Sequence, residues 1–120
     1  AQWLEDHPDV GEVTYAGLKT SKYAQIVKKI YPRGAGALFT IALNGGYDAC
    51  LKLVNNVNLF SHVANLGDAR SLIIHPASTV HRQLTEEQQI EAGLAPNVVR
   101  LSIGIEDPTD LIKDLKQALE

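Results

Sequence analysis

The feature that most restricts the fold is a nearly continuous apolar run at residues 36–43, GALFTIAL. A short run of this kind, bounded by turn residues, predicts a well-buried strand. Apolar residues recur at helical spacing on both sides of the run, at Tyr23, Ile26, Val27 and Ile30 and again at Cys50, Leu53, Val54 and Val57. The chain therefore alternates helices with short strands, which is the pattern of an α/β fold.

Turn residues mark the ends of these two helices. Pro32 is expected to end the first helix, because the residue before a proline avoids helical geometry. Asn44-Gly45-Gly46 is expected to form the turn into the second helix. The amides of Gly45 and Gly46 could hold an anion at a helix start, although a plain tight turn is the interpretation we favour.

The remainder of the chain continues the alternation. Further strands are expected at residues 13–15, 58–63, 71–74 and 98–103. Thr85 and Gln88 form a capping-box pattern that begins a helix ending at Gly93, and Asp107-Pro108 begins the last helix. The apolar face of that last helix is made of Leu111, Leu115, Ala118 and Leu119. We expect an α+β two-layer sandwich, with helices on one side of a single sheet and the other side free to meet another surface.

Length and composition fit one soluble domain spanning residues 1–120. Hydrophobic residues make up 45% of the chain, charged residues make up 21%, and the net charge is −3. No stretch approaches the roughly 20 apolar residues of a membrane helix, so no membrane partner is expected. Cys50 is the single cysteine. It excludes an intrachain disulfide and makes a reducing, cytoplasmic setting the default expectation.

The start of the chain suggests that it is a fragment. Methionine is absent from all 120 residues. The opening AQWLEDHP resembles the last turns of a helix without a capping residue before Ala1. We expect a longer protein that was cut within or just before this helix.

Other candidate sites have simpler interpretations. No acid occurs between Glu12 and Asp48, whereas that segment carries the basic residues Lys19, Lys22, Lys28, Lys29 and Arg33. A patch for nucleic acid or phosphate is possible, but we favour a solvated helix face and expect no nucleic-acid partner, since the total charge is negative. The four histidines do not have metal-ligand spacing, so no metal site is expected.

Arg100 stands out in the apolar stretch NVVRLSIGI at residues 97–105. On a strand, Val99 and Leu101 share one face, which is core, and Arg100 and Ser102 share the other. A structural interpretation is an edge-strand arginine paired with an acid. A functional interpretation is a bidentate grip on a carboxylate or phosphate, for which the planar guanidinium is well suited. Residue chemistry alone leaves both open.

Longer stretches of the sequence resemble a known family. FSHVANLGDARSLIIHPASTVHRQL, EEQQIEAGL and NVVRLSIGIED, together with HPDV, PRGAGALFT and NGGYDA, are similar to the C-terminal domain of the pyridoxal-phosphate enzymes of cysteine and methionine metabolism. Within the family, LFSHVANLGDARSLIIHPAS is most similar to the O-acetylhomoserine sulfhydrylases. Cystathionine synthases, cystathionine lyases and methionine lyases tend to carry serine where this chain has Asn65.

The resemblance implies a fold, a reaction and a site. The family has the aspartate-aminotransferase-like fold (fold type I), and this chain resembles its small C-terminal domain. The intact enzyme would convert O-acetylhomoserine and sulfide to homocysteine and acetate in methionine biosynthesis, with pyridoxal 5'-phosphate as electron sink. Arg100 would bind the substrate α-carboxylate, with help from Asn65 and from the amide of Leu66. Asn65 departs from the serine of the relatives, so its contact can differ.

The resemblance also implies what this chain lacks. The family's Schiff-base lysine and phosphate-binding residues belong to the large domain, so the fragment is expected to bind no cofactor and to be inactive alone. Its expected partners are its own N-terminal cofactor domain and further copies in a homo-oligomer. The alternatives are a cystathionine γ-synthase or methionine γ-lyase, a stand-alone amino-acid-binding α/β module, and a structural domain in which Arg100 forms a surface ion pair.

Overall fold

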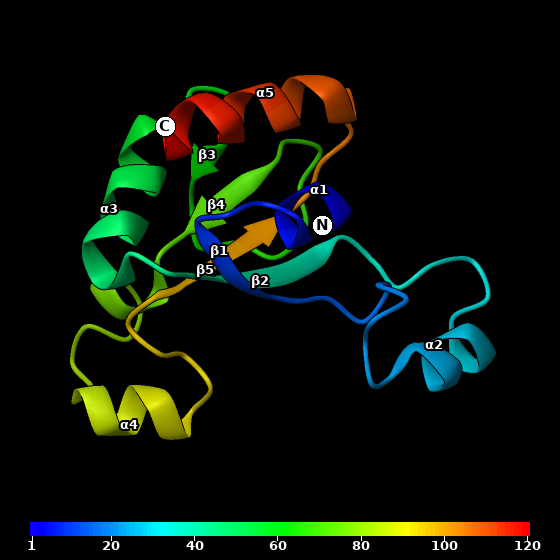
Figure 1. Ribbon diagram of the computed structural model, residues 1–120, viewed down its shortest axis with the longest axis horizontal. Coiled ribbons are helices and arrows are strands. Elements are labelled where there is room, and N and C mark those ends of the chain that lie inside the picture. Colours follow the sequence, from blue (N-terminus) through cyan, green and yellow to red (C-terminus); the bar gives the residue numbers. More distant parts are fainter.

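A five-stranded mixed sheet forms the centre of the molecule in the computed structural model, which describes residues 1–120 (Figure 1). Its strands are β1 (Val10–Thr14), β2 (Leu38–Leu43), β3 (Ser61–His62), β4 (Leu72–Ile74) and β5 (Val98–Ser102). The strand order is β1-β2-β5-β4-β3, and only the β3–β4 pair is parallel. β5 is therefore the middle strand, paired with β2 on one side and β4 on the other.

Five α-helices accompany the sheet. They are α1 (Gln2–Glu5), α2 (Ala24–Ile30), α3 (Gly46–Asn56), α4 (Glu86–Glu91) and α5 (Pro108–Leu119), and a 3₁₀ turn occupies Pro76–Ser78. In Figure 1, α3 and α5 lie along the sheet, while α2 stands away from it at the end of two long connections. None of these helices combines the length and apolar character that a membrane span needs.

The hydrophobic core lies on one side of the sheet. Ile41 of β2 and Val99 and Leu101 of β5 are at most 1% exposed and point toward the helices. The helices α1, α3 and α5 contribute Leu4, Cys50, Leu53, Val54, Leu111, Leu115 and Ala118. The expectation of one sheet with helices on one side is confirmed for these three helices, and the last one buries the predicted apolar face.

Local signals placed several helix ends correctly. Thr85 and Gln88 form the predicted capping box, with each side chain accepting from the other residue's backbone N–H. Gly93 follows α4 with φ +72, a left-handed conformation that favours glycine. Asp107 caps α5 and Pro108 occupies its first turn.

Every predicted strand differs from the structure at an end, and two of them begin three residues away from the expected position. The first is β1 at Val10–Thr14, which starts before the expected range of 13–15 and contains a register shift between Val10 and Glu12. The expected strand at 58–63 is wrong for residues 58–60 and for residue 63, because only Ser61–His62 pair with β4. The backbone N–H groups of residues 58–60 donate instead to the carboxylate of Asp114 on α5.

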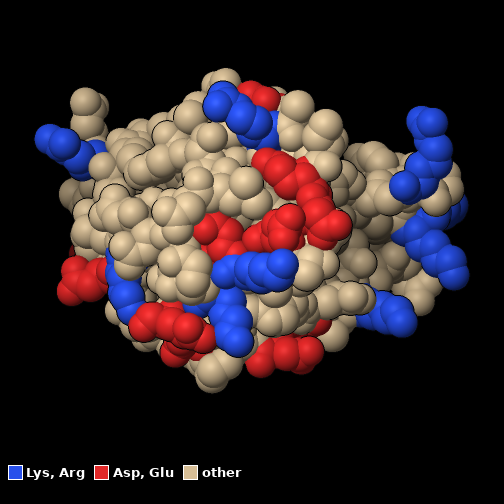
Figure 2. Space-filling model, turned by 90° about the horizontal axis from the view of Figure 1, so that it is seen from above, with Lys and Arg blue, Asp and Glu red and all other residues tan.

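The predicted helix at residues 23–30 is confirmed as α2, but this chain leaves its apolar face uncovered. Tyr23, Ile26 and Ile30 are 52%, 57% and 59% exposed, and no residue of α2 is buried. The basic residues of this segment are exposed as well, and Figure 2 shows basic side chains gathered on the projecting part at the right of the view. α2 thus carries a solvated basic surface together with unpacked apolar side chains.

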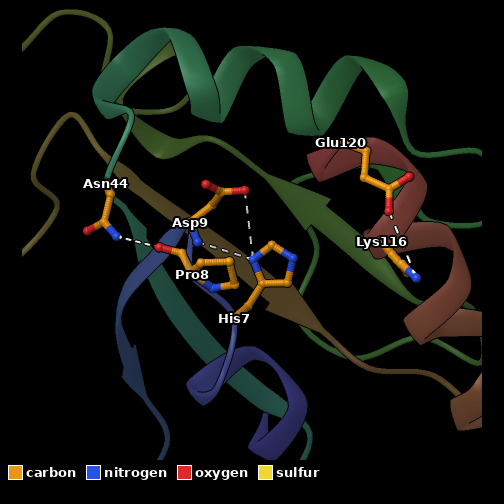
Figure 3. Close-up of polar contacts among 6 residues, drawn as sticks. All are labelled: His7, Pro8, Asp9, Asn44, Lys116 and Glu120. Atoms are coloured by element: carbon orange, nitrogen blue, oxygen red, sulfur yellow. Dashed lines mark hydrogen bonds and ion pairs between the residues drawn. The ribbon is translucent and has the colours of Figure 1, made fainter.

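The turn before β1 is tied to the turn before α3 (Figure 3). The side-chain amide of Asn44 donates to the carbonyl of Pro8 at 2.9 Å, and the backbone N–H of Asn44 donates to the carbonyl of Asp9. The N–H of Asp9 donates in turn to Nδ1 of His7. These bonds fix α1 and the entry to β1 relative to β2.

Candidate functional site

Arg100 lies on the middle strand of the sheet, on the face opposite the core. Its neighbours Val99 and Leu101 are fully buried among the helices, as the alternation of side chains along a strand predicts. Its Cα pairs with Thr40 of β2 and Ile74 of β4. The interpretation of Arg100 as an edge-strand residue is therefore wrong.

The guanidinium of Arg100 contacts a loop and no acid. Its Nη2 donates to the carbonyls of Ala64 at 2.9 Å and Asn65 at 3.2 Å. The three ion pairs of the structure involve His7 with Asp9, Lys113 with Asp110, and Lys116 with Glu120. The interpretation of Arg100 as a surface ion pair within this chain is therefore wrong, and its Nε and Nη1 groups have no partner in the chain.

The three residues predicted for the site lie close together. The carbonyl contact brings Asn65 to Arg100, and Leu66 follows in the same loop with 66% of its surface exposed. The N–H of Leu66 and the side chain of Asn65 make no hydrogen bond within the chain. Arg100, which keeps unused N–H donors, thus contacts a loop whose next residue, Leu66, also keeps a free N–H. An anion with two oxygen atoms suits such a set of donors.

Two features of this region were missed from the sequence. Arg100 holds the loop through two carbonyls, and Ser102 accepts a hydrogen bond from the N–H of Gly67 at 3.2 Å. The alternation along β5 indicated that Ser102 shares the face of Arg100, but no local pattern indicated the loop that meets it. An open hollow nearby is lined by His62, Ala64, Ile74, Thr79 and Val80.

Other nucleophilic and metal-ligating residues have structural surroundings. Cys50, on the apolar stripe predicted for the second helix, is fully buried, and burial raises the pKa of its thiol to about 12. No group of three His, Cys, Asp or Glu side chains has a geometry for a metal ion.

The lysines of the chain do not fit the task of holding an aldehyde cofactor. Such a lysine lies in an enclosed site where its amine can be made neutral. Every lysine here is exposed, on α2, α3, α5 or the connections beside α2. No lysine of this chain therefore has the enclosed surroundings that such a site requires.

Fold and site together define the class of this chain: an α/β domain that presents an arginine without an acidic partner, beside a loop with free amides. The model of the Cys/Met metabolism PLP-dependent enzyme family matches residues 1–120. The chain belongs to this family.

Its relatives include enzymes of two activities. It is 44% identical over 119 residues to "O-acetyl-L-homoserine sulfhydrylase 1" of Thermus thermophilus, covering 99% of this chain and 28% of that protein. It is 41% identical to "L-methionine gamma-lyase" of Fusobacterium nucleatum subsp. polymorphum, covering 99% of this chain and 30% of that protein. The chain thus spans less than a third of the length of these relatives.

A solved structure has the same fold. An O-acetylhomoserine (thiol)-lyase of Campylobacter jejuni, crystallised with a pyridoxyl-lysine-5'-monophosphate group, superposes with a TM-score of 0.90 at 42% identity. The match covers 99% of this chain and 28% of that enzyme. The predicted α/β fold is confirmed, and the solved structure that shares it carries a pyridoxyl-lysine group.

Proposed function

We propose that residues 1–120 are the small C-terminal domain of an O-acetylhomoserine sulfhydrylase and bind the α-carboxylate of its substrate. The intact enzyme would convert O-acetylhomoserine and sulfide to homocysteine and acetate. The observation that carries the proposal is Arg100, which points away from the core, has no acid beside it and keeps unused donors. The sulfhydrylases among the relatives support the reaction.

Arg100 would act by charge and by geometry. Its guanidinium can donate two parallel N–H···O bonds, which fix both the position and the angle of a carboxylate. The amide of Leu66 would add a donor from the side of the loop, and the side chain of Asn65, which has no partner within the chain, would add another. Held in this way, the substrate presents its Cα–H bond in one direction, which lowers the entropic part of the reaction barrier.

Bound pyridoxal phosphate supplies an electron sink for the chemistry at Cα and beyond. The exposed lysines of this chain leave that cofactor to the rest of the enzyme, so the isolated chain is expected to be inactive and to bind no pyridoxal phosphate specifically. The exposed apolar face of α2 would contact the rest of the enzyme. That rest would be the larger part, since this chain covers 28% of the length of the sulfhydrylase relative. The intact enzyme would form a homo-oligomer and would act in the cytoplasm.

A methionine γ-lyase is the second candidate, because a lyase of this name is 41% identical over almost the whole chain. The two candidates are separated by assaying the intact enzyme with each substrate. A sulfhydrylase forms homocysteine from O-acetylhomoserine and sulfide, whereas a methionine lyase releases methanethiol from methionine. The proposal requires that the first reaction have the larger kcat/KM.

Replacement of Arg100 tests the proposed site in the intact enzyme. We expect Arg100→Ala to lower kcat/KM for O-acetylhomoserine by about 2–4 kcal/mol of transition-state stabilisation. Arg100→Lys should not restore it, because lysine keeps the charge but loses the planar fork. The matched control is Arg70→Ala, which removes an exposed arginine of the same loop and should leave the kinetics unchanged. Normal kinetics for Arg100→Ala, or a variant that fails to fold, would show that Arg100 is only structural.

A further inference from the structure

The connection between β3 and β4 follows the strand that carries Arg100. Hydrogen bonds join the two segments at successive positions and in the same order along both. They pair Arg100 with Ala64 and Asn65, Ser102 with Gly67, Ile105 with Ala69, and Glu106 with Ser71. The loop at residues 63–70 is therefore held along most of its length by β5 and the residues that follow it.

Ser102 holds the part of the loop next to Leu66. Its side chain is on the same face of β5 as Arg100, and the residue is only 4% exposed. Its Oγ accepts from the N–H of Gly67, which has φ +81. With this peptide group fixed, the preceding peptide is restricted as well, and the N–H of Leu66 remains without a partner in the chain.

Glu106 holds the end of the loop. Its carboxylate accepts from the N–H of Ser71 at 2.7 Å and from the Ser71 hydroxyl at 2.8 Å. The oxygen of that hydroxyl accepts from the N–H of Gly104 at 2.9 Å, and Ser71 is fully buried. Burial acts to raise the pKa of Glu106, but the hydrogen bonds from Ser71 outweigh it and lower the pKa below its ordinary value.

Gly104 shows how closely the two segments approach. A Cβ at this position would collide with the carbonyl oxygen of Ala69 and with the backbone of Arg70. The N–H of Ile105 donates to the carbonyl of Ala69 at 2.9 Å in the same place. At this position the backbones of the two segments are in contact, so the extension of β5 limits where the loop can lie.

We propose that Ser102 and Glu106 are positioning residues that hold the loop at residues 63–70 so that the N–H of Leu66 and the guanidinium of Arg100 converge on the same carboxylate. The inference rests on the proposed function, since it assigns the loop to that site. Neither side chain needs to touch the substrate. Their loss should weaken ligands that carry an α-carboxylate and spare ligands that lack one.

The test uses the intact enzyme and two inhibitors that differ only by the carboxylate, L-norvaline and n-butylamine. We expect Ser102→Ala and Glu106→Gln each to raise the inhibition constant of norvaline by about 3- to 10-fold, the usual effect of one lost hydrogen bond, and to leave that of butylamine unchanged. The matched control is Asp107→Asn, because Asp107 caps α5 from the position beside Glu106 and does not contact the loop. It should change neither constant.

Hydrogen exchange of the peptide covering residues 63–71 gives a readout that does not depend on any ligand, and it should be faster in both variants than in the Asp107→Asn control. Unchanged norvaline inhibition in both variants, or equal weakening of both inhibitors, would overturn the inference.

Arg100→Ala distinguishes a failure of the positioning role from a failure of the proposed function. If it weakens norvaline while Ser102→Ala does not, the positioning role alone fails. If it does not weaken norvaline, the proposed function fails and the positioning role fails with it.

Discussion

His75 is an ionisable side chain that the fold encloses completely. It is 0% exposed, with Nε2 at 2.7 Å from the carbonyl of Pro96 and Nδ1 at 3.0 Å from the hydroxyl of Ser78. The ring of Tyr47 meets it edge-on. A neutral imidazole that donates through Nε2 and accepts through Nδ1 satisfies both contacts. Burial lowers the pKa of His75, although the Pro96 carbonyl acts in the opposite direction.

We therefore expect the chain to lose stability as the pH falls below neutrality. The unfolded chain takes up a proton on this histidine near its ordinary pKa of about 6.5, whereas the folded chain resists protonation to lower pH. The stabilisation is thus fully present above about pH 7 and declines as the pH falls toward 5.5. Urea unfolding between pH 7.5 and 5.5 measures the slope.

The control variants for this pH dependence are His75→Gln and His81→Gln. His75→Gln should be less stable at every pH but should lose most of the slope, while His81→Gln should retain it. A wild-type free energy of unfolding that is constant over this range would contradict the assignment.

At the residue scale, the sequence predicted the sheet face on which a side chain lies better than it predicted the residues that the side chain contacts. Alternation along a strand was enough to place Arg100 and Ser102 on one face and Val99 and Leu101 on the other. The carbonyls that Arg100 contacts belong to residues 64 and 65, which no local pattern could place. The middle position of β5 depends likewise on strand order, which a single sequence does not show. The resemblance to a family, and not the spacing of residues, pointed to Asn65 and Leu66.

At the scale of elements, the segment between α3 and β3 is organised by one carboxylate. Asp114 is 7% exposed and accepts from the backbone N–H groups of Asn58, Leu59 and Phe60 at 2.8, 2.8 and 3.3 Å. The side chain of Gln117 donates to the same carboxylate. A helix side chain thus replaces the neighbouring strand that these amides would otherwise need.

Asp114→Ala should lower the free energy of unfolding of the 120-residue chain by about 3 kcal/mol, because it leaves one buried and two partly buried backbone donors unpaired. The control is Asp110→Ala on the same helix, which removes an exposed ion pair with Lys113 and should change stability by less than about 1 kcal/mol. Chemical denaturation of both variants measures the difference. Equal effects would mean that the Asp114 contacts contribute little.

At this scale, an element could be predicted where its start depends on residues that are close together in the sequence. The capping box at Thr85 and the Asp107-Pro108 start depend on residues within one turn, and both were predicted. The strand expected at 58–63 is mostly wrong, because the N–H groups of its first half donate to the carboxylate of Asp114, more than 50 residues away in the sequence. The apolar stripe of α2 predicted the helix correctly but could not show that the chain leaves these apolar residues exposed.

At the scale of the whole molecule, α2 is the clearest candidate for a contact surface. The helix stands apart from the sheet in Figure 1. Its apolar residues Ile26 and Ile30 are more than half exposed. Tyr31, just after the helix, is 60% exposed as well. Contiguous exposed apolar side chains of this kind mark contact surfaces.

The isolated chain should therefore self-associate. Sedimentation is expected to show dimers or larger species at high concentration, and Ile26→Gln with Ile30→Gln should reduce them. Ile105→Gln is the control, since Ile105 is 86% exposed but lies far along the chain from α2. A strictly monomeric wild-type chain would instead favour an independent amino-acid-binding module.

The most direct test of the account is a crystal structure of the intact enzyme with L-norvaline bound. The account predicts that the norvaline carboxylate accepts from the guanidinium of Arg100 and from the N–H of Leu66, with donor–acceptor distances of about 2.7–3.2 Å. A norvaline carboxylate held elsewhere, with the guanidinium of Arg100 still bound only to the carbonyls of Ala64 and Asn65, would contradict it.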